Sequence, residues 1–532
     1  MSQVESAPKM SDADGPLPRA ARFDPTDPPV RWRELLAVVL LVALADLTIY
    51  RGHGFAGWAA LLVLAPLLLV LGMPKLHLRR SVGLIAAMLL VLSLRMIWLG
   101  SALGAVTGLA LLITLAVTLQ GRRPQLGDVI ASSIESLAMG GMRLGVYVGH
   151  LLRFGPKLQS GIVMPLAALV LFSGLFVLAN PDLVTRVVTL ARDFADAIQR
   201  WLGQVPFGIQ ELLFWVGVAW LSAGLFRTCR KSVASTASRS APPAPAETTS
   251  DWYVPVRNTL ASVIVLFAVY LTFEFSTLWF RTFPQGFYYA GYAHEGAAWL
   301  TTALAFATLM LSLMFRGKLL HDPRIGRLRG LAWVWSGLNL LLALTVYHRL
   351  HIYIDFNGMT RMRTVALFGT SVVVVGFALV VWKIAQGYDF AWLVRNQLWA
   401  LACTIFLFAI TPVDALVHRY NVRQIMAGDL APAVQITEHP VNSEGIMMLL
   451  PLTDCPDATI KAGIRAMLAE RYLRLESELQ QRQSLGWTSH QLADTACWQL
   501  LQKNRNRWDD HLDDAKRSAA WRQFREYAYQ WY

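Results

Sequence analysis

The chain has 532 residues, of which 55% are hydrophobic and only 16% are charged, and its formal net charge is +13. Soluble globular proteins carry charges at about a quarter of their positions, so this composition excludes that class and favours a protein of the lipid bilayer. The basic surplus falls in short segments between apolar runs, and the part from Asp414 onward has about as many acidic as basic residues, which argues against nucleic acid as a partner.

Residues 1–31 are polar and proline-rich, without the basic start and short apolar core of a signal peptide, and are predicted to be a disordered cytoplasmic tail. About eleven apolar stretches follow, each long enough to cross the membrane as a helix. They lie within Leu35–Tyr50, Phe55–Met73, Val82–Leu99, Ser101–Leu119, Ile162–Leu178, Leu212–Phe226, Thr259–Trp279, Gly296–Phe315, Leu331–Tyr347, Val365–Trp382 and Leu398–Val413. The sequence therefore predicts an all-α polytopic transmembrane bundle, in which a tight turn at Gly100 divides the third and fourth spans.

Basic residues recur at alternate ends of these stretches, and Lys and Arg near a span are retained in the cytoplasm. They are Arg31, Arg33, Lys75, Arg79, Arg80, Arg122, Arg123, Arg227, Arg230, Lys231, Arg316, Lys318, Arg324, Arg327 and Arg329. This pattern predicts a multi-pass protein of a bacterial cytoplasmic (inner) membrane with its N-terminus inside and its C-terminus outside. One loop disagrees, because His348–Arg363 has three arginines on the predicted outer side.

Two segments are predicted not to span the membrane. A glycine-broken helix over 128–152 either dips into the bilayer or lies on it, and an amphipathic helix over 183–203 lies on the outer interface. A flexible cytoplasmic linker over 231–254, rich in Ser, Ala, Pro and Thr, divides a first membrane half, 32–230, from a second, 255–413. No internal repeat is visible, so the inverted repeats of many transporters are not indicated.

Residues 414–532 are predicted to form an extracytoplasmic helical domain of three amphipathic helices. The first begins after the capping residue Asp457, and the second is capped by Thr488 or Ser489. Cys455 and Cys497 lie in this domain, where an oxidising compartment allows a disulfide between them. The alternative is that both are ordinary small buried residues.

Ionisable residues near the ends of apolar spans are costly in lipid and are candidate functional residues. Glu295 and Arg349 lie at similar depth on neighbouring spans, so they are expected to form an ion pair; a ligand or lipid head-group site is the alternative. Glu274 lies deeper, without a partner nearby in sequence, and suits proton or cation handling. The stripe of His348, His351 and Asp355 is a weak metal signal, and we predict no metal site and no cofactor.

Several of these residues fall in a pattern that resembles a family of bacterial membrane proteins, the domain of unknown function 4153/4173. The similarity runs from Leu260 to Arg423 and departs from the family at His294, where an arginine is expected. It is carried by Tyr292-Ala293-His294-Glu295-Gly296, by Arg349, Tyr353, Gly358, Thr360, Arg361 and Arg363, and by Asp414 to Arg423, including Arg419 and Asn421. The resemblance implies the membrane architecture and names no activity. The predicted polar cluster thus comprises Glu274, His294, Glu295, Arg349, Tyr353, Asp355, Arg361, Arg363, Asp414, Arg419 and Asn421.

Three classes of function fit this pattern. The first is an envelope scaffold or sensor that presents the C-terminal domain, with the lipid bilayer and an envelope protein as partners. The second is a transporter or channel for a small ion or solute that uses Glu274, Glu295 and Arg349. The third is an enzyme that acts on lipid-linked material at the outer face, with Glu295 or Asp355 as base. We rank them in that order, because the soluble C-terminal part and the linker suit partner binding, whereas the sequence shows neither the repeats nor the broken helices of transporters.

Overall fold

The fold is that of a computed structural model, which describes residues 31–151, 208–226, 251–279 and 289–531 apart from short gaps, with three isolated residues between 186 and 192. This part of the chain is helical and contains no strand. Nine of its helices are long and apolar enough to cross a membrane. They are α2 (Phe55–Gly72), α3 (Arg80–Leu99), α4 (Ala102–Leu119), α8 (Ile209–Phe226), α9 (Tyr253–Glu274), α10 (Tyr289–Met314), α11 (Ile325–Asn357), α12 (Arg361–Gln386) and α13 (Phe390–Ile410).

These nine helices coincide with nine of the predicted spans. The first predicted span is a shorter helix, α1 (Trp32–Ala45), which continues into a π-helical turn at Asp46–Tyr50. The fifth span and the amphipathic segment 183–203 fall almost entirely outside the described residues. The division at Gly100 is present: α3 ends at Leu99, and the Ser101 hydroxyl caps α4 by accepting a bond from the Gly104 amide at 3.1 Å.

The first membrane half packs α1, α2, α3, α4 and α8 around one apolar core. The helix expected to be broken by glycines is continuous, α5 (Leu126–Leu151), and it packs along α8. Its Arg143 donates to the Gly224 carbonyl at 2.9 Å, and its Tyr147 hydroxyl donates to Glu34 of α1 at 3.1 Å. Tertiary contacts of this kind outweigh the modest helix penalty of an internal glycine.

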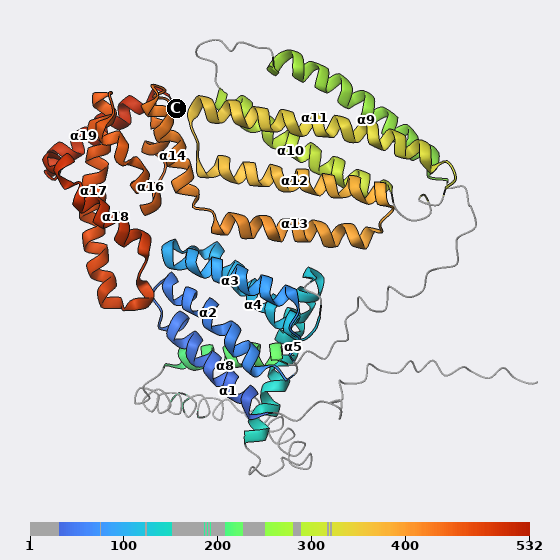
Figure 1. Cartoon of the computed structure of the whole chain (residues 1–532), viewed down its shortest axis with the longest axis horizontal. Helices are drawn as coiled ribbons and strands as arrows, with labels where there is room; N and C mark the ends of the chain where they lie inside the picture. The colour runs from blue at the N-terminus through green and yellow to red at the C-terminus, as the bar shows by residue number, and fades with distance from the viewer. Residues whose placement is uncertain are drawn as a thin grey trace, which may run out of the picture.

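The second membrane half consists of α9 to α13, with α11, α12 and α13 side by side in Figure 1. Its core is apolar. The buried Lys383 ammonium donates to two carbonyls at the C-terminal end of α10. The Phe315 carbonyl, just beyond the helix, lies at 2.9 Å, and the Ser312 carbonyl, in the last turn, lies at 3.4 Å. A cation is stabilised there by the unpaired carbonyls at a helix C-terminus. The two halves meet where α13 packs against α3, α4 and α5.

The C-terminal helices form a separate apolar core and lie across one end of both membrane halves (Figure 1). They are α14 (Val413–Met426), α15 (Ala433–Glu438), α16 (Ser443–Leu449), α17 (Ala458–Leu485), α18 (Leu492–Lys503) and α19 (Asp514–Tyr529), with short 3-10 turns between them. Asp457 caps α17 as predicted, by accepting from the Ile460 amide at 2.8 Å. The predicted cap of the next helix is wrong: α18 begins after Gln491, and the Thr488 hydroxyl instead accepts from the His53 amide at 3.2 Å.

Cys455 and Cys497 are free thiols in the structure, so the disulfide is not formed. Each thiol is almost fully buried in the apolar core of the C-terminal domain, with 2% and 0% of the residue exposed, and serves as a small core residue. Burial raises the pKa of the Cys497 thiol to about 12.

We therefore expect thiol labelling of the denatured protein to give the same count with and without reductant. In the native protein at pH 8, Cys497 should stay unlabelled, because almost none of it is thiolate and the reagent cannot reach it. A gain of two labelled thiols on reduction would instead show that Cys455 and Cys497 form the disulfide.

Candidate functional site

The loop between α11 and α12 is the centre of the candidate site. The chain leaves α11 through Gly358, whose φ of +80° favours glycine, and enters α12 at Thr360. The Thr360 hydroxyl caps α12 by accepting from the Arg363 amide at 3.1 Å. Two tight helix ends therefore fix the backbone of Met359 between them.

The side-chain amide of Asn421, on α14, pairs with the backbone of this loop. It accepts from the Met359 amide at 2.6 Å and donates to the Met359 carbonyl at 2.9 Å. A Cβ on Gly358 would lie only 2.8 Å from the Asn421 oxygen, so the close approach requires glycine. Asn421 is fully buried, and a buried amide is stable only when its hydrogen bonds are made.

Two arginines at the start of α12 stabilise the junction between the α11–α12 loop and α14. Arg361 forms a two-point ion pair with the buried Asp414 of α14, which also accepts from the Asn442 amide at 3.2 Å. Arg363 donates to the Gly358 carbonyl and lies 3.7 Å from the centre of the Tyr353 ring. The structure thus brings together five residues of the predicted cluster, namely Tyr353, Arg361, Arg363, Asp414 and Asn421.

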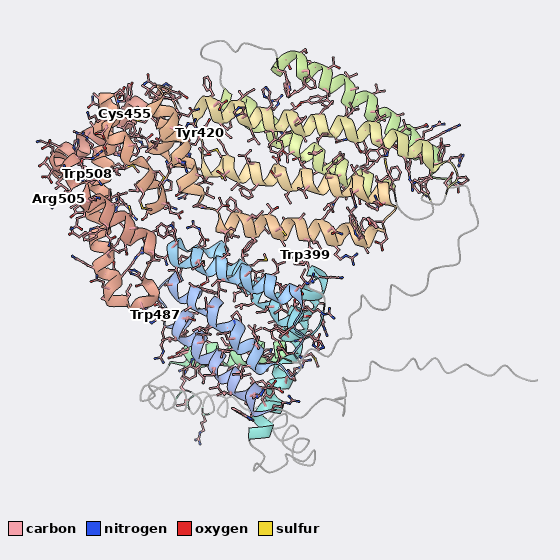
Figure 2. The ribbon with its side chains drawn as sticks, viewed as in Figure 1. Trp399, Tyr420, Cys455, Trp487, Arg505 and Trp508 are labelled. Atoms are coloured by element: carbon pink, nitrogen blue, oxygen red, sulfur yellow. The ribbon has the colours of Figure 1, made fainter. Side chains whose placement is uncertain are left out.

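Asp355 joins the outer edge of the junction. It accepts at 2.8 Å from the hydroxyl of Tyr420 on α14, which is labelled in Figure 2, and it lies 3.3 Å from His351. The pKa of Tyr420 is raised by burial and by this bond to a carboxylate. His348 stacks instead on Trp279, with ring centres 4.4 Å apart. The described residues contain no group of three side chains placed to hold a metal ion.

Arg349 forms its ion pair with Glu274, deep between α9 and α11. Its guanidinium donates to both carboxylate oxygens at 2.6 and 2.8 Å, and the Tyr270 hydroxyl donates to the same carboxylate at 3.0 Å. A Cβ on Gly296 would overlap the Arg349 side chain, so α10 also closes on this pair. The charged partner of Glu274 is therefore distant in the sequence, 75 residues away. The side chains of His294 and Glu295 lie outside the described residues, so the Glu295–Arg349 pair stays a prediction.

The C-terminal domain also contacts the first membrane half, through residues that the predicted cluster omits. Arg95, in the last turns of α3, makes two bonds to the buried Glu444 of α16, at 2.5 and 2.9 Å. Gln491 accepts from the Gly100 amide at 2.6 Å and donates to the Met96 carbonyl at 3.3 Å. By contrast, Arg419 of the predicted cluster lies exposed on α14.

His418, beside the junction on α14, is buried, and burial lowers its pKa to about 4. It is therefore neutral at physiological pH, although Asp414 nearby opposes the shift. A Cβ on Gly445 would lie 2.6 Å from its ring, which shows how closely α16 packs there. The junction thus combines paired charges with a neutral imidazole, and its side chains are closely packed.

These features define a polytopic helical membrane protein whose C-terminal domain is bonded to both membrane halves at one face. The chain belongs to the family described as "Domain of unknown function (DUF4153)", whose model matches residues 31–435. The match begins far upstream of the region in which the sequence resemblance was visible, and it includes Arg95, the α11–α12 loop, Asp414 and Asn421. No curated protein and no solved structure matches the chain.

Proposed function

We propose that this protein is a scaffold or sensor of the bacterial envelope, set in the cytoplasmic membrane, which holds its helical domain on the outer surface. The observation that carries the proposal is the double attachment of this domain. Arg95–Glu444 joins it to the first half, and Arg361–Asp414 with Asn421 joins it to the second. A domain attached in this way keeps a fixed position over the membrane, as presentation of a binding surface requires.

The pairing of charges in the membrane helices favours this function over ion transport. Glu274 is bonded to Arg349 and Tyr270, Lys383 to helix-end carbonyls, and Asp46 to Trp215 at 2.8 Å and Arg51 at 2.9 Å. Charges satisfied in this way stabilise helix packing, whereas a transport site needs groups that exchange partners with the substrate. We therefore assign them a structural role.

A flux assay separates the two functions. We expect proteoliposomes with the full-length protein to show the same proton and monovalent-cation flux as empty liposomes. Flux that is present in the wild type and lost in Glu274→Gln would contradict the scaffold function and show that the protein is a transporter that uses Glu274.

The domain also offers a surface for a partner. A groove of about 680 Å³ lies between α15, α17 and α19, lined by Glu470, Arg474, Ser518 and Trp521 among others. Figure 1 places α19 on the side of the domain away from the membrane helices. Mixed charges around an aromatic residue are typical of protein interfaces.

We expect a photo-crosslinking amino acid at Ser518, in the groove, to capture one envelope protein in intact cells. The same amino acid at Lys503, exposed on α18 and outside the groove lining, is the matched control. Identical adducts at both positions, or none at either, would contradict presentation through this groove.

The proposed orientation puts on the outer side one loop, His348–Arg363, whose three arginines disagree with the charge rule. These arginines are all bound within the protein: Arg349 to Glu274, Arg361 to Asp414, and Arg363 to the Gly358 carbonyl. The partners satisfy the three guanidinium groups on the proposed outer side of the folded protein.

We expect alkaline phosphatase fused after Tyr532 to be active and a fluorescent protein fused there to be dark, because phosphatase folds only outside the cytoplasm. The reverse result would place the C-terminal domain in the cytoplasm. A fusion within linker residues 231–254 is the matched control and should behave in the opposite way.

A further inference from the structure

A large cavity of the described structure lies where the C-terminal domain meets the first membrane half. It has a volume of about 1140 Å³ and lies between the outer turns of α2 and α3 on one side and the α17–α18 hairpin on the other. Trp487, at the tip of this hairpin, is found near the start of α2 in Figure 2. The volume is slightly above the range for ligand sites, about 300–1,000 Å³.

The membrane side of the cavity is apolar and is hollowed by small residues. Ala56 and Ala60 of α2 line it together with Ile97 of α3. One turn deeper, Val63 and Leu64 also line the cavity and are 41% and 44% exposed. Because exposed apolar residues of a membrane helix face lipid, the cavity opens there to the hydrocarbon layer.

The opposite side is polar. Arg482, Gln480, Glu476 and His490 line it, and the Arg482 guanidinium is held in place by a 2.5 Å bond to Asp494. The Arg482 side chain stays 32% exposed, and a guanidinium has five N–H donors, so Arg482 can bind a second acceptor from the cavity.

The hairpin tip is suited to the membrane surface. Leu485, Trp487 and Leu492 are 40%, 53% and 43% exposed, although they belong to the C-terminal domain. Exposed Leu and Trp beside the end of a membrane helix are typical of the layer where head groups meet acyl chains. The polar side of the cavity therefore lies at head-group level and its apolar side at acyl-chain level.

We propose that this cavity binds a glycerophospholipid from the adjoining leaflet. The acyl chains lie against Ala60 and Val63 of α2, and the phosphate faces Arg482 and His490. Inorganic phosphate alone would leave the apolar wall unfilled, and a hydrocarbon alone would leave the donors of the polar wall without an acceptor. The site goes beyond the scaffold function and does not depend on it.

The test uses the full-length protein purified in a mild detergent, with bound phospholipid measured by native mass spectrometry. We expect Ala60→Trp to lower the retained phospholipid by about tenfold, because the indole takes the volume of several acyl methylene groups. Leu67→Trp is the matched control: Leu67 lies on the same helix, is 64% exposed to lipid and does not line the cavity, so retention should be unchanged. Equal retention in the wild type and in Ala60→Trp would overturn the proposal.

A second measurement needs no variant. A phospholipid with a photoreactive acyl chain is cross-linked to the wild-type protein in liposomes, and the labelled peptides are mapped. We expect labelling of residues 55–64 that is competed by excess unlabelled phospholipid and unaffected by inorganic phosphate. Competition by inorganic phosphate, or labelling spread evenly over the lipid-facing helices, would exclude a phospholipid site.

Discussion

Glu274→Ala should lower the free energy of unfolding by about 3–5 kcal/mol, because it removes one partner of a buried ion pair. Glu274 and Arg349 are only 1% and 5% exposed, and two hydrogen bonds of 2.6 and 2.8 Å join them. Without the Glu274 carboxylate, the guanidinium keeps its desolvation cost and loses this two-point attraction. The measurement is thermal or denaturant unfolding of the purified protein in detergent.

The double variant Glu274→Leu/Arg349→Met is the informative control. Replacing both charges by apolar residues of similar volume removes the desolvation cost together with the attraction, so most of the lost stability should return. Arg419→Ala, at an exposed arginine of the same candidate cluster, should change the stability by less than about 0.5 kcal/mol. A Glu274→Ala protein as stable as the wild type would mean that the pair does not hold α9 to α11.

The membrane helices could be predicted from the sequence because their signal is local. An apolar run of sufficient length must be a helix in lipid, where every backbone group needs an internal partner. The same reasoning found the Asp457 cap and the turn at Gly100. It misjudged α5, because packing against α8 and α1 decides whether a helix with internal glycines stays continuous, and that packing cannot be seen in a local window.

The candidate site could be predicted only in part, because its partners are distant in the chain. Asp414, Asn421, Arg361 and Arg363 were selected through the family resemblance, but the pairing of Asn421 with the Met359 backbone has no sequence signal. Arg95 and Glu444 are 349 residues apart. One lies in a membrane span and the other in the C-terminal domain, so the sequence around either residue does not predict its pairing with the other. Depth alone points to Glu295 as the partner of Arg349, whereas the ion pair that the structure describes is with Glu274.

Glu444→Ala should release the C-terminal domain from the first membrane half while leaving the domain folded. Glu444 is 2% exposed, and its two bonds to Arg95 are the charged contact between α16 and α3 that the structure describes. Removing one partner of a buried, hydrogen-bonded charge pair across an interface costs about 2–5 kcal/mol. Because the apolar core of the domain does not include Glu444, its helices should keep their packing.

Disulfide trapping measures this release directly. The His53 amide lies 3.2 Å from the Thr488 hydroxyl, so His53→Cys/Thr488→Cys, in a chain whose native cysteines are replaced by alanine, should cross-link rapidly. Adding Glu444→Ala should slow the cross-link by about thirtyfold or more, the factor that corresponds to the lower end of that cost. Reversing both charges, Arg95→Glu/Glu444→Arg, should restore part of the rate. Asp509→Ala removes an exposed ion pair with Arg505 in the same domain and should leave the rate unchanged. Equal rates in the parent and in Glu444→Ala would show that apolar packing alone docks the domain, and the double attachment on which the scaffold function rests would lose one of its two anchors.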